Sequence, residues 1–190
     1  MKSLGYLITF FSFLICTSCI DQPEFYTLDV TNTDLVLDNG VLFFKNKPFN
    51  GVLEAYYDNE VKNMKVEYEN GRKHGLELSW YRNKVVASER WYQNGIKTGV
   101  HRAYWDNGNA KFIYHFNNKG EYNGSIKEWY YTGEMIRDFN YLNGKERGSQ
   151  KMWTQNGNIR ANYEVINGER FGLIGLKKCY QVTTSIDDIK

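Results

Sequence analysis

The chain has 190 residues and a formal net charge of +2, and it is rich in aromatic residues (16%) and in glycine (17 residues). Positive and negative residues are interspersed, so the chain lacks the concentrated basic face that nucleic-acid binding requires, and we expect no nucleic-acid partner. Aromatic residues favour strands and glycines favour the turns between them, which predicts an all-β protein.

The first nineteen residues are predicted to be a targeting segment that does not belong to the fold. Lys2 precedes a nearly unbroken apolar run over residues 4–16. A helix that spans a bilayer needs about 20 apolar residues, so a shorter run suits the core of a secretory signal peptide. The small residues Thr17 and Ser18 then lead to Cys19.

Residues 1–19 resemble a bacterial lipoprotein signal, in which the cysteine after two small residues is acylated and becomes the new N-terminus. The resemblance implies that Cys19 carries lipid and anchors the protein to the bacterial cell envelope, at the inner or the outer membrane. The alternative is cleavage without acylation. Apart from Cys19, only Cys179 would remain after cleavage, so we expect no internal disulfide and a small buried hydrophobe at Cys179.

Six glycines recur at nearly constant spacing through the rest of the chain. The successive spacings are 24, 24, 25, 24 and 24 residues, and the glycines are Gly51, Gly75, Gly99, Gly124, Gly148 and Gly172. A period in this range predicts a repeat array, in which each copy buries its apolar surface against its neighbours. We count positions within each copy from its glycine, which is position 0.

Two turn signals divide each copy. An Asn-Gly pair stands four residues before most of these glycines, as in Asn70-Gly71, and a second signal such as Asn107-Gly108 stands in mid-copy. Asn-Gly is the strongest short hairpin signal, because both residues tolerate positive φ. Each copy is therefore expected to be a strand, a tight mid-copy turn, a strand and a longer turn. The fold predicted is an elongated single-layer antiparallel sheet of hairpins.

The ends of the array are expected to be atypical. Residues 20–38 are predicted to be a tether and N-terminal cap, and Asn39-Gly40 begins a half copy in which Phe44 matches the later Tyr68. The array is expected over residues 39–182, with a last copy that loses its aromatic residues. Residues 183–190 are expected to be a frayed tail.

Aromatic residues recur at three positions of the copies. Position 17 carries Tyr68, Tyr92, Phe116, Tyr141 and, as an exception, Val165. Position 6 carries Tyr57, Tyr81, Trp105, Tyr130 and, as an exception, Thr154. Position 5, which we call the aromatic row, carries Tyr56, Trp80, Tyr104, Trp129 and Trp153.

A two-residue turn at positions 8 and 9 would place position 6 opposite 11, position 4 opposite 13 and position 2 opposite 15. The face expected to be packed then carries Tyr81, Val86, Ser88, Tyr92, Trp105, Ala110, Phe112, Tyr114 and Phe116. The aromatic row lies on the other face, with the charged neighbours Glu54, Arg102, Lys111, Lys127, Lys151 and Arg160. The row is either packing material or a platform for a ligand, and deep burial of Trp80 and Trp129 would exclude the platform.

The order Asn-Gly-x-x-x-Gly, aromatic pair, Asn-Gly and a further aromatic residue is similar to the MORN repeat, and more narrowly to the 24-residue bacterial variant of the YwqK-type antitoxin family. Residues 70–75 with Trp80-Tyr81 are one example. The resemblance covers about residues 39–178. It implies an elongated twisted sheet used for protein contacts or membrane association, and in some relatives an antitoxin role. It carries over no catalytic residue.

No arrangement of residues predicts catalysis, a metal or a cofactor. His74, His101 and His115 lack neighbours at metal-ligand spacing, and no nucleophile elbow or phosphate-binding loop is present in the sequence. We therefore expect a non-enzymatic binding or scaffold lipoprotein that recognises a protein partner, in an antitoxin-like or immunity-like manner. The alternative is a glycan-binding or cell-wall-binding module, which Trp129-Tyr130-Tyr131 loosely fits.

Overall fold

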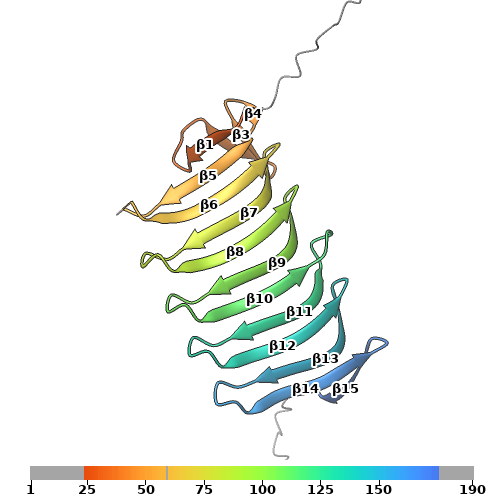
Figure 1. Ribbon diagram of the computed structural model, residues 1–190. Coiled ribbons are helices and arrows are strands. Elements are labelled where there is room, and N and C mark those ends of the chain that lie inside the picture. Colours follow the sequence, from red (N-terminus) through yellow and green to blue (C-terminus); the bar gives the residue numbers. More distant parts are fainter. Residues whose placement is uncertain (1–23, 59, 176–190) are drawn as a thin grey trace, which may run out of the picture.

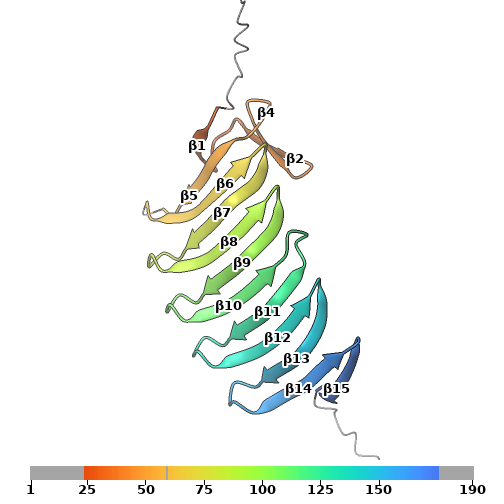
Figure 2. The ribbon, with the colours of Figure 1, turned by 45° about the vertical axis from the view of Figure 1, so that its right-hand side comes forward.

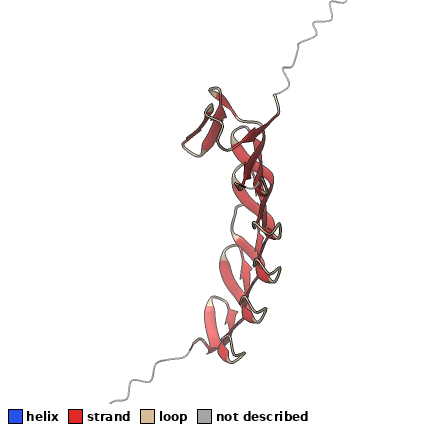
Figure 3. Cartoon of the chain, turned by 90° about the vertical axis from the view of Figure 1, so that its left-hand side faces the viewer, coloured by secondary structure: helices blue, strands red, loops and turns tan. Residues whose placement is uncertain are grey.

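The computed structural model describes residues 24–58 and 60–175, and this part of the chain is all-β. Its strands stack in chain order along one long axis (Figures 1 and 2). A twelve-stranded sheet has the order β1-β5-β6-β7-β8-β9-β10-β11-β12-β13-β14-β15, and a three-stranded sheet has the order β2-β3-β4. Edge-on, the long sheet is a single layer (Figure 3). The expected fold class is therefore confirmed. The predictions for residues 1–19, Cys19, Cys179 and residues 183–190 concern residues outside this described part.

The bounds of the strands follow the 24-residue period from β5 on. They are β1 Tyr26–Asp29, β2 Leu35–Asp38, β3 Val41–Phe44, β4 Lys47–Pro48, β5 Gly51–Tyr56, β6 Lys62–Glu69, β7 Arg72–Trp80, β8 Val86–Gln93, β9 Ile96–Tyr104, β10 Ala110–Phe116, β11 Tyr122–Trp129, β12 Met135–Leu142, β13 Lys145–Trp153, β14 Ile159–Ile166 and β15 Glu169–Leu173.

The lengths of the two kinds of turn are the reverse of those predicted. Asn70-Gly71 forms a two-residue turn between β6 and β7, with φ values of 49° and 73°. The mid-copy turn has three loop residues: Tyr81 N–H donates to the Val85 carbonyl (2.8 Å), and Lys84 N–H donates to the Tyr81 carbonyl (2.9 Å). Position 9 supplies the positive φ there, as Lys84 (68°). The tight turn is thus the Asn-Gly turn, and the longer one lies in mid-copy.

Four of the six periodic glycines, Gly75, Gly99, Gly124 and Gly148, lie inside strands at bulges and not in turns. Between β6 and β7, Val66 pairs with Glu77 and Tyr68 pairs with Lys73, so three residues around Gly75 lie opposite one. Gly75 has a φ of +87°, and a Cβ added there would lie 2.2 Å from a Glu67 carboxylate oxygen. A bulge of this kind favours glycine because the residue must adopt a left-handed conformation.

At each of four bulges, a polar side chain bonds backbone groups that the ladder leaves open. Leu76 N–H donates to the Glu67 carboxylate (3.0 Å), and His101 Nε2–H donates to the Trp91 carbonyl (2.8 Å). His115 Nδ1–H donates to the Ser125 carbonyl (2.7 Å), and Gln150 bonds both Asn140 N–H and Asn140 C=O. These contacts matter because an unpaired buried backbone group costs about 1–3 kcal/mol.

One face of the sheet holds most of the core, and we call it the packed face. His101, which is buried, lies between the rings of Tyr92 (5.5 Å between centroids) and Phe116 (4.6 Å). The ring contacts continue through Phe116, Tyr122 and Tyr141 into later copies. Of the residues predicted for this face, Ser88, Tyr92, Phe112, Tyr114 and Phe116 belong to it, as burial and ring contacts indicate.

Two other residues predicted for the packed face, Val86 and Ala110, are on the opposite face. In each hairpin the register shifts by one residue between positions 4 and 5 of the first strand, so that position 5 pairs with position 11: Trp80 with Val86, and Tyr104 with Ala110. The extra residue at position 12 forms this second bulge, which moves position 11 beside the aromatic row.

At the N-terminal end, the strand that follows Asn39-Gly40 joins a small separate sheet and not the array. Strand β1 lies within the residues predicted to be a tether and N-terminal cap, and it pairs parallel with β5. Strands β2, β3 and β4 form the separate small sheet, which lies to one side of the long sheet at this end (Figure 3). Phe44 of β3 and Phe49, which follows β4, pack with Leu53 in one cluster, and Tyr68 packs against it. The small sheet therefore covers the packed face of the first copy.

The buried imidazole of His101 predicts a pH dependence of stability. Desolvation lowers its pKa below the usual 6.5, with Arg90 and Lys97 adding to the effect, while the bond to the Trp91 carbonyl and the charge of Glu77 oppose it. Between pH 6.5 and the lower pKa of the folded state, the unfolded chain binds more protons. The free energy of unfolding should therefore decrease as pH falls through that window, by at most about 1.4 kcal/mol per pH unit for this group.

The comparison that isolates this effect is His101→Gln, because Gln150 occupies the same position 2 in another copy and bonds the same kind of bulge. Urea unfolding at several pH values between 5 and 7.5 should give a shallower pH dependence for His101→Gln than for the natural chain. Parallel curves for the two proteins would contradict the prediction.

Candidate binding surface

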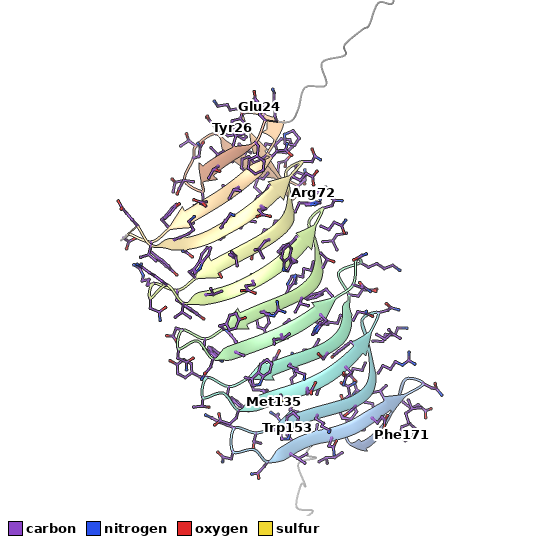
Figure 4. All side chains as sticks on the ribbon, in the orientation of Figure 1. Glu24, Tyr26, Arg72, Met135, Trp153 and Phe171 are labelled. Atoms are coloured by element: carbon purple, nitrogen blue, oxygen red, sulfur yellow. The ribbon has the colours of Figure 1, made fainter. Side chains whose placement is uncertain are left out.

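The five residues of the aromatic row end five alternate strands of the long sheet. Tyr56, Trp80, Tyr104, Trp129 and Trp153 are the last residues of β5, β7, β9, β11 and β13. Neighbouring strands lie about 4.8 Å apart, so rings from successive copies recur about every 9.6 Å along the array. The partner across each hairpin is the first residue of the next strand: Lys62, Val86, Ala110, Met135 and Ile159. Met135 and Trp153 are labelled in Figure 4.

The backbone under the row is held by the aromatic residues of position 6, which join one copy to the next. Tyr57 Oη donates to the Trp80 carbonyl (3.0 Å), and Tyr81 Oη donates to the Tyr104 carbonyl (2.9 Å). Trp105 Nε1–H donates to the Trp129 carbonyl (3.2 Å), and Tyr130 Oη donates to the Trp153 carbonyl (3.4 Å). Each bond crosses from one copy to the following one, so the row is positioned by contacts between copies.

Position 6 has one exception in the sequence. Thr154 stands there in the copy whose row residue is Trp153, and no sixth residue of the row follows it. Thr154 instead bonds within its own turn, to Asn158. The bonds of position 6 between copies could not be read from the sequence, although this exception was a signal of them.

No residue of the row is buried. Tyr56 is 46% exposed, and Trp80, Tyr104, Trp129 and Trp153 are half-buried. The deep burial of Trp80 and Trp129 that would exclude a platform is therefore not found. Within the described residues, no ring of the row contacts another ring, and Lys62 lies over the Tyr56 ring at 5.6 Å. Tyr56 Oη also donates to Glu54, which raises the pKa of Tyr56.

Charged residues of both signs flank the row at positions 3 and 14. Arg102 lies 3.8 Å from Glu89, and Lys127 lies 3.5 Å from Asp138. Lys62 bonds Glu54 at 2.6 Å. Because acidic and basic residues alternate across the strands, this face presents no single-sign field to a partner.

Two of the charged residues predicted to neighbour the row, Lys111 and Arg160, belong to the bulge at position 12. Lys111 belongs to the bulge at position 12, where its ammonium lies 4.3 Å from the centre of the Trp105 ring. Arg160 occupies the equivalent position in a later copy and is exposed. The rings of Tyr81 and Trp105, predicted for the packed face, reach the next copy near the mid-copy turns. The bulge and the three-residue turn account for all of these shifts.

The described residues offer no metal site beside the row. Within residues 24–58 and 60–175, no three His, Cys, Asp or Glu side chains gather as metal ligands would. The same residues include no helix with the length and apolarity needed to cross a membrane. The histidines His101 and His115 bond bulge carbonyls, and His74 lies 2.9 Å from Glu69.

Comparison with known proteins adds no assignment to this geometry. No protein-family model matches the chain, and no curated protein matches it.

Proposed function

We propose that this chain is a membrane-anchored, non-enzymatic binding lipoprotein that holds a protein partner on the aromatic row. The observation that carries the proposal is the row itself: five rings from five copies lie in line, and none is buried. Tyr and Trp are enriched at protein interfaces because they bury much area on few rotatable bonds. The bonds from position 6 pre-organise the backbone of the row, which lowers the entropic cost of binding.

The residues beside the rings favour a protein partner over a glycan. Four of the five cross-strand partners in the row are apolar, namely Val86, Ala110, Met135 and Ile159. A stripe of rings and aliphatic side chains with a charged border resembles the core and rim of a protein interface. A sugar site would place polar side chains beside the stacking ring, to bond the hydroxyl groups. The glycan-binding module is therefore the alternative.

The proposed function includes a lipid anchor at Cys19 and a repeat of the MORN type. The signal that ends at Cys19 supports lipid attachment and a place in the bacterial cell envelope. The 24-residue period and its Asn-Gly turns support a MORN-type repeat of the YwqK-type variety. An antitoxin-like or immunity-like capture of another protein is the corresponding role. A row that crosses five copies supports it, because affinity can be spread over a long surface.

The test starts with the lipidated protein, crosslinked in its native cells and purified, with the co-purified protein identified by mass spectrometry. Binding of that purified partner is then measured for the variant Trp80→Ala/Tyr104→Ala/Trp129→Ala. Truncating three interface rings should weaken binding by about 100-fold or more. A Cys19→Ser variant should move from the membrane fraction to the soluble fraction.

The matched control is Trp91→Ala, because Trp91 is 44% exposed but does not belong to the row. This control should leave the affinity unchanged, and circular dichroism should show that both variants stay folded. Equal affinity of the triple variant and the natural chain would overturn the proposal. Binding of purified cell-wall polysaccharide that the triple variant loses would support the alternative instead.

A further inference from the structure

Four Asn-Gly turns of the array are alike in sequence and in local conformation, and they follow one another along one long edge (Figure 1). In each, both loop residues have positive φ and lie between two strand ends that pair directly, as Ile166 pairs with Glu169. Differences among the four turns therefore come from their surroundings. The turns are Asn70-Gly71, Asn94-Gly95, Asn143-Gly144 and Asn167-Gly168.

In the first three turns, the backbone N–H of the glycine is bonded to the preceding copy. The acceptor is each time the carbonyl two residues before the periodic glycine of that copy. The bonds run from Gly71 to Phe49 (2.8 Å), from Gly95 to Lys73 (2.7 Å) and from Gly144 to Tyr122 (2.9 Å).

The asparagine of these three turns is also held by the preceding copy. Asn70 N–H donates to the side-chain oxygen of Asn50 (2.8 Å), and Asn143 N–H donates to that of Asn123 (3.2 Å). In the remaining turn, the Asn94 side-chain oxygen lies 3.3 Å from His74 Nδ1. Each of the three turns is therefore fixed at two points.

The fourth turn has neither kind of bond within the described residues. The equivalent acceptor for Gly168 N–H is the Glu146 carbonyl, and the two are not bonded. Arg147 stands where Asn50 and Asn123 stand in other copies, so Asn167 N–H has no side-chain acceptor. A hollow lies at this place, and its lining includes Glu146, Arg147, Asn167 and Gly168.

An Asn-Gly pair can deamidate without an enzyme or an oxidant. The glycine nitrogen attacks the side-chain carbonyl carbon of asparagine, so that a nitrogen–carbon bond forms, the bond from that carbon to Nδ2 breaks, and the amide proton leaves with ammonia. Water then opens the cyclic imide at either carbonyl and gives aspartate or isoaspartate. Glycine permits the attack because no Cβ hinders its nitrogen. A turn must open before these atoms can meet, so bonds that hold it closed slow the reaction.

We propose that Asn167 is a site of spontaneous deamidation, and that it converts faster than the other three turn asparagines because its turn is not bonded to the preceding copy. The turn also adjoins β15, the last strand of the sheet, which pairs with β14 alone among the described strands. Opening it therefore breaks few contacts. The product adds a negative charge, and its isoaspartate form adds a carbon atom to the backbone of the turn. This inference does not depend on the aromatic row or on lipid attachment.

Incubation of the full, folded chain near neutral pH tests the proposal. Peptide mapping by mass spectrometry gives the rate of conversion at each turn, and labelling with isoaspartyl methyltransferase identifies the isoaspartate. Asn167 should convert about 5-fold faster or more than Asn70, Asn94 and Asn143, because each lost bond makes opening easier. In the chain unfolded by urea, the four should convert at similar rates, since each precedes glycine.

Two variants test the cause. Arg147→Asn supplies the acceptor that Asn50 and Asn123 supply in other copies, and it should slow conversion at Asn167 about 3-fold or more. Arg147→Ala is the matched control, because it removes the same side chain without adding an acceptor, and it should leave the rate unchanged. Asn123→Ala should speed conversion at Asn143, and circular dichroism should show that all three variants stay folded.

Three results would overturn the proposal. One is equal conversion at the four turns of the folded chain. Another is a faster rate at Asn167 that persists in urea, which would place the cause in the local sequence. The third is equal slowing by Arg147→Asn and Arg147→Ala, because the arginine and not the missing acceptor would then govern the rate.

Discussion

Replacing Gly51 by alanine is expected to lower the free energy of unfolding by about 3–5 kcal/mol. A Cβ at this position would lie 1.9 Å from the Tyr26 carbonyl oxygen and 2.8 Å from the Tyr26 carbonyl carbon. Both are backbone atoms of β1, which pairs with β5 through this same pair of residues. The backbone cannot yield without separating β1 from β5. Gly51 also has a φ of +145°, which strains an alanine further.

The matched control is Gly148→Ala, at the same position 0 of another copy. Gly148 has a φ of +71°, and a Cβ there would meet nothing within 4 Å. Only the backbone conformation opposes that change, at a cost of about 1–2 kcal/mol. Urea unfolding followed by circular dichroism should therefore give a much lower free energy of unfolding for Gly51→Ala than for Gly148→Ala. Equal losses would mean that the close contact with β1 is not what requires glycine at Gly51.

Gln150→Leu is expected to destabilise the chain by about 3 kcal/mol. Gln150 is fully buried, and its amide accepts from Asn140 N–H (3.1 Å) and donates to the carbonyls of Asn140 (2.8 Å) and Arg147 (3.2 Å). Leucine has a similar size but leaves these backbone groups without partners at a bulge. The cost comes from the buried groups left unpaired, so it exceeds the value of an ordinary hydrogen bond.

Another copy supplies the matched control for this variant. At the bulge between β10 and β11, position 2 is the apolar Ile126, and His115 on the facing strand bonds the Ser125 carbonyl (2.7 Å). At the bulge between β12 and β13, Asn140 bonds the equivalent Ser149 carbonyl (2.6 Å), and Gln150 bonds the backbone of Asn140 in addition. Ile126→Leu removes no polar partner and should cost less than about 1.5 kcal/mol, as measured by the midpoint of urea unfolding. Equal losses for Ile126→Leu and Gln150→Leu would show that the bonds of Gln150 are not the source of the effect.

Much of this architecture could be predicted because glycine and Asn-Gly respond to local backbone demands. Positive φ at Asn70, Gly71 and Gly75 is a property of single residues, so the period and the hairpins could be predicted without tertiary contacts. The aromatic row could be predicted from the same period. Its residues occupy one position of successive copies and end alternate strands, so their rings share a face.

Register and capping were decided by the tertiary structure. Position 11 joins the row only because an additional residue at position 12 forms a bulge. A bulge costs little free energy, so the pairing with neighbouring strands decides whether it forms. The polar residues of position 2 could not be predicted as buried, because Glu77, His101 and Gln150 are stable there only with partners from other strands or turns. The N-terminal sheet likewise folds aside because Phe44 and Phe49 find Leu53, a contact that no periodicity encodes. The sequence by itself therefore determined the repeating hairpin, through backbone preferences of single residues. Only the tertiary structure decided which side chains face each other, because that depends on hydrogen bonds between strands.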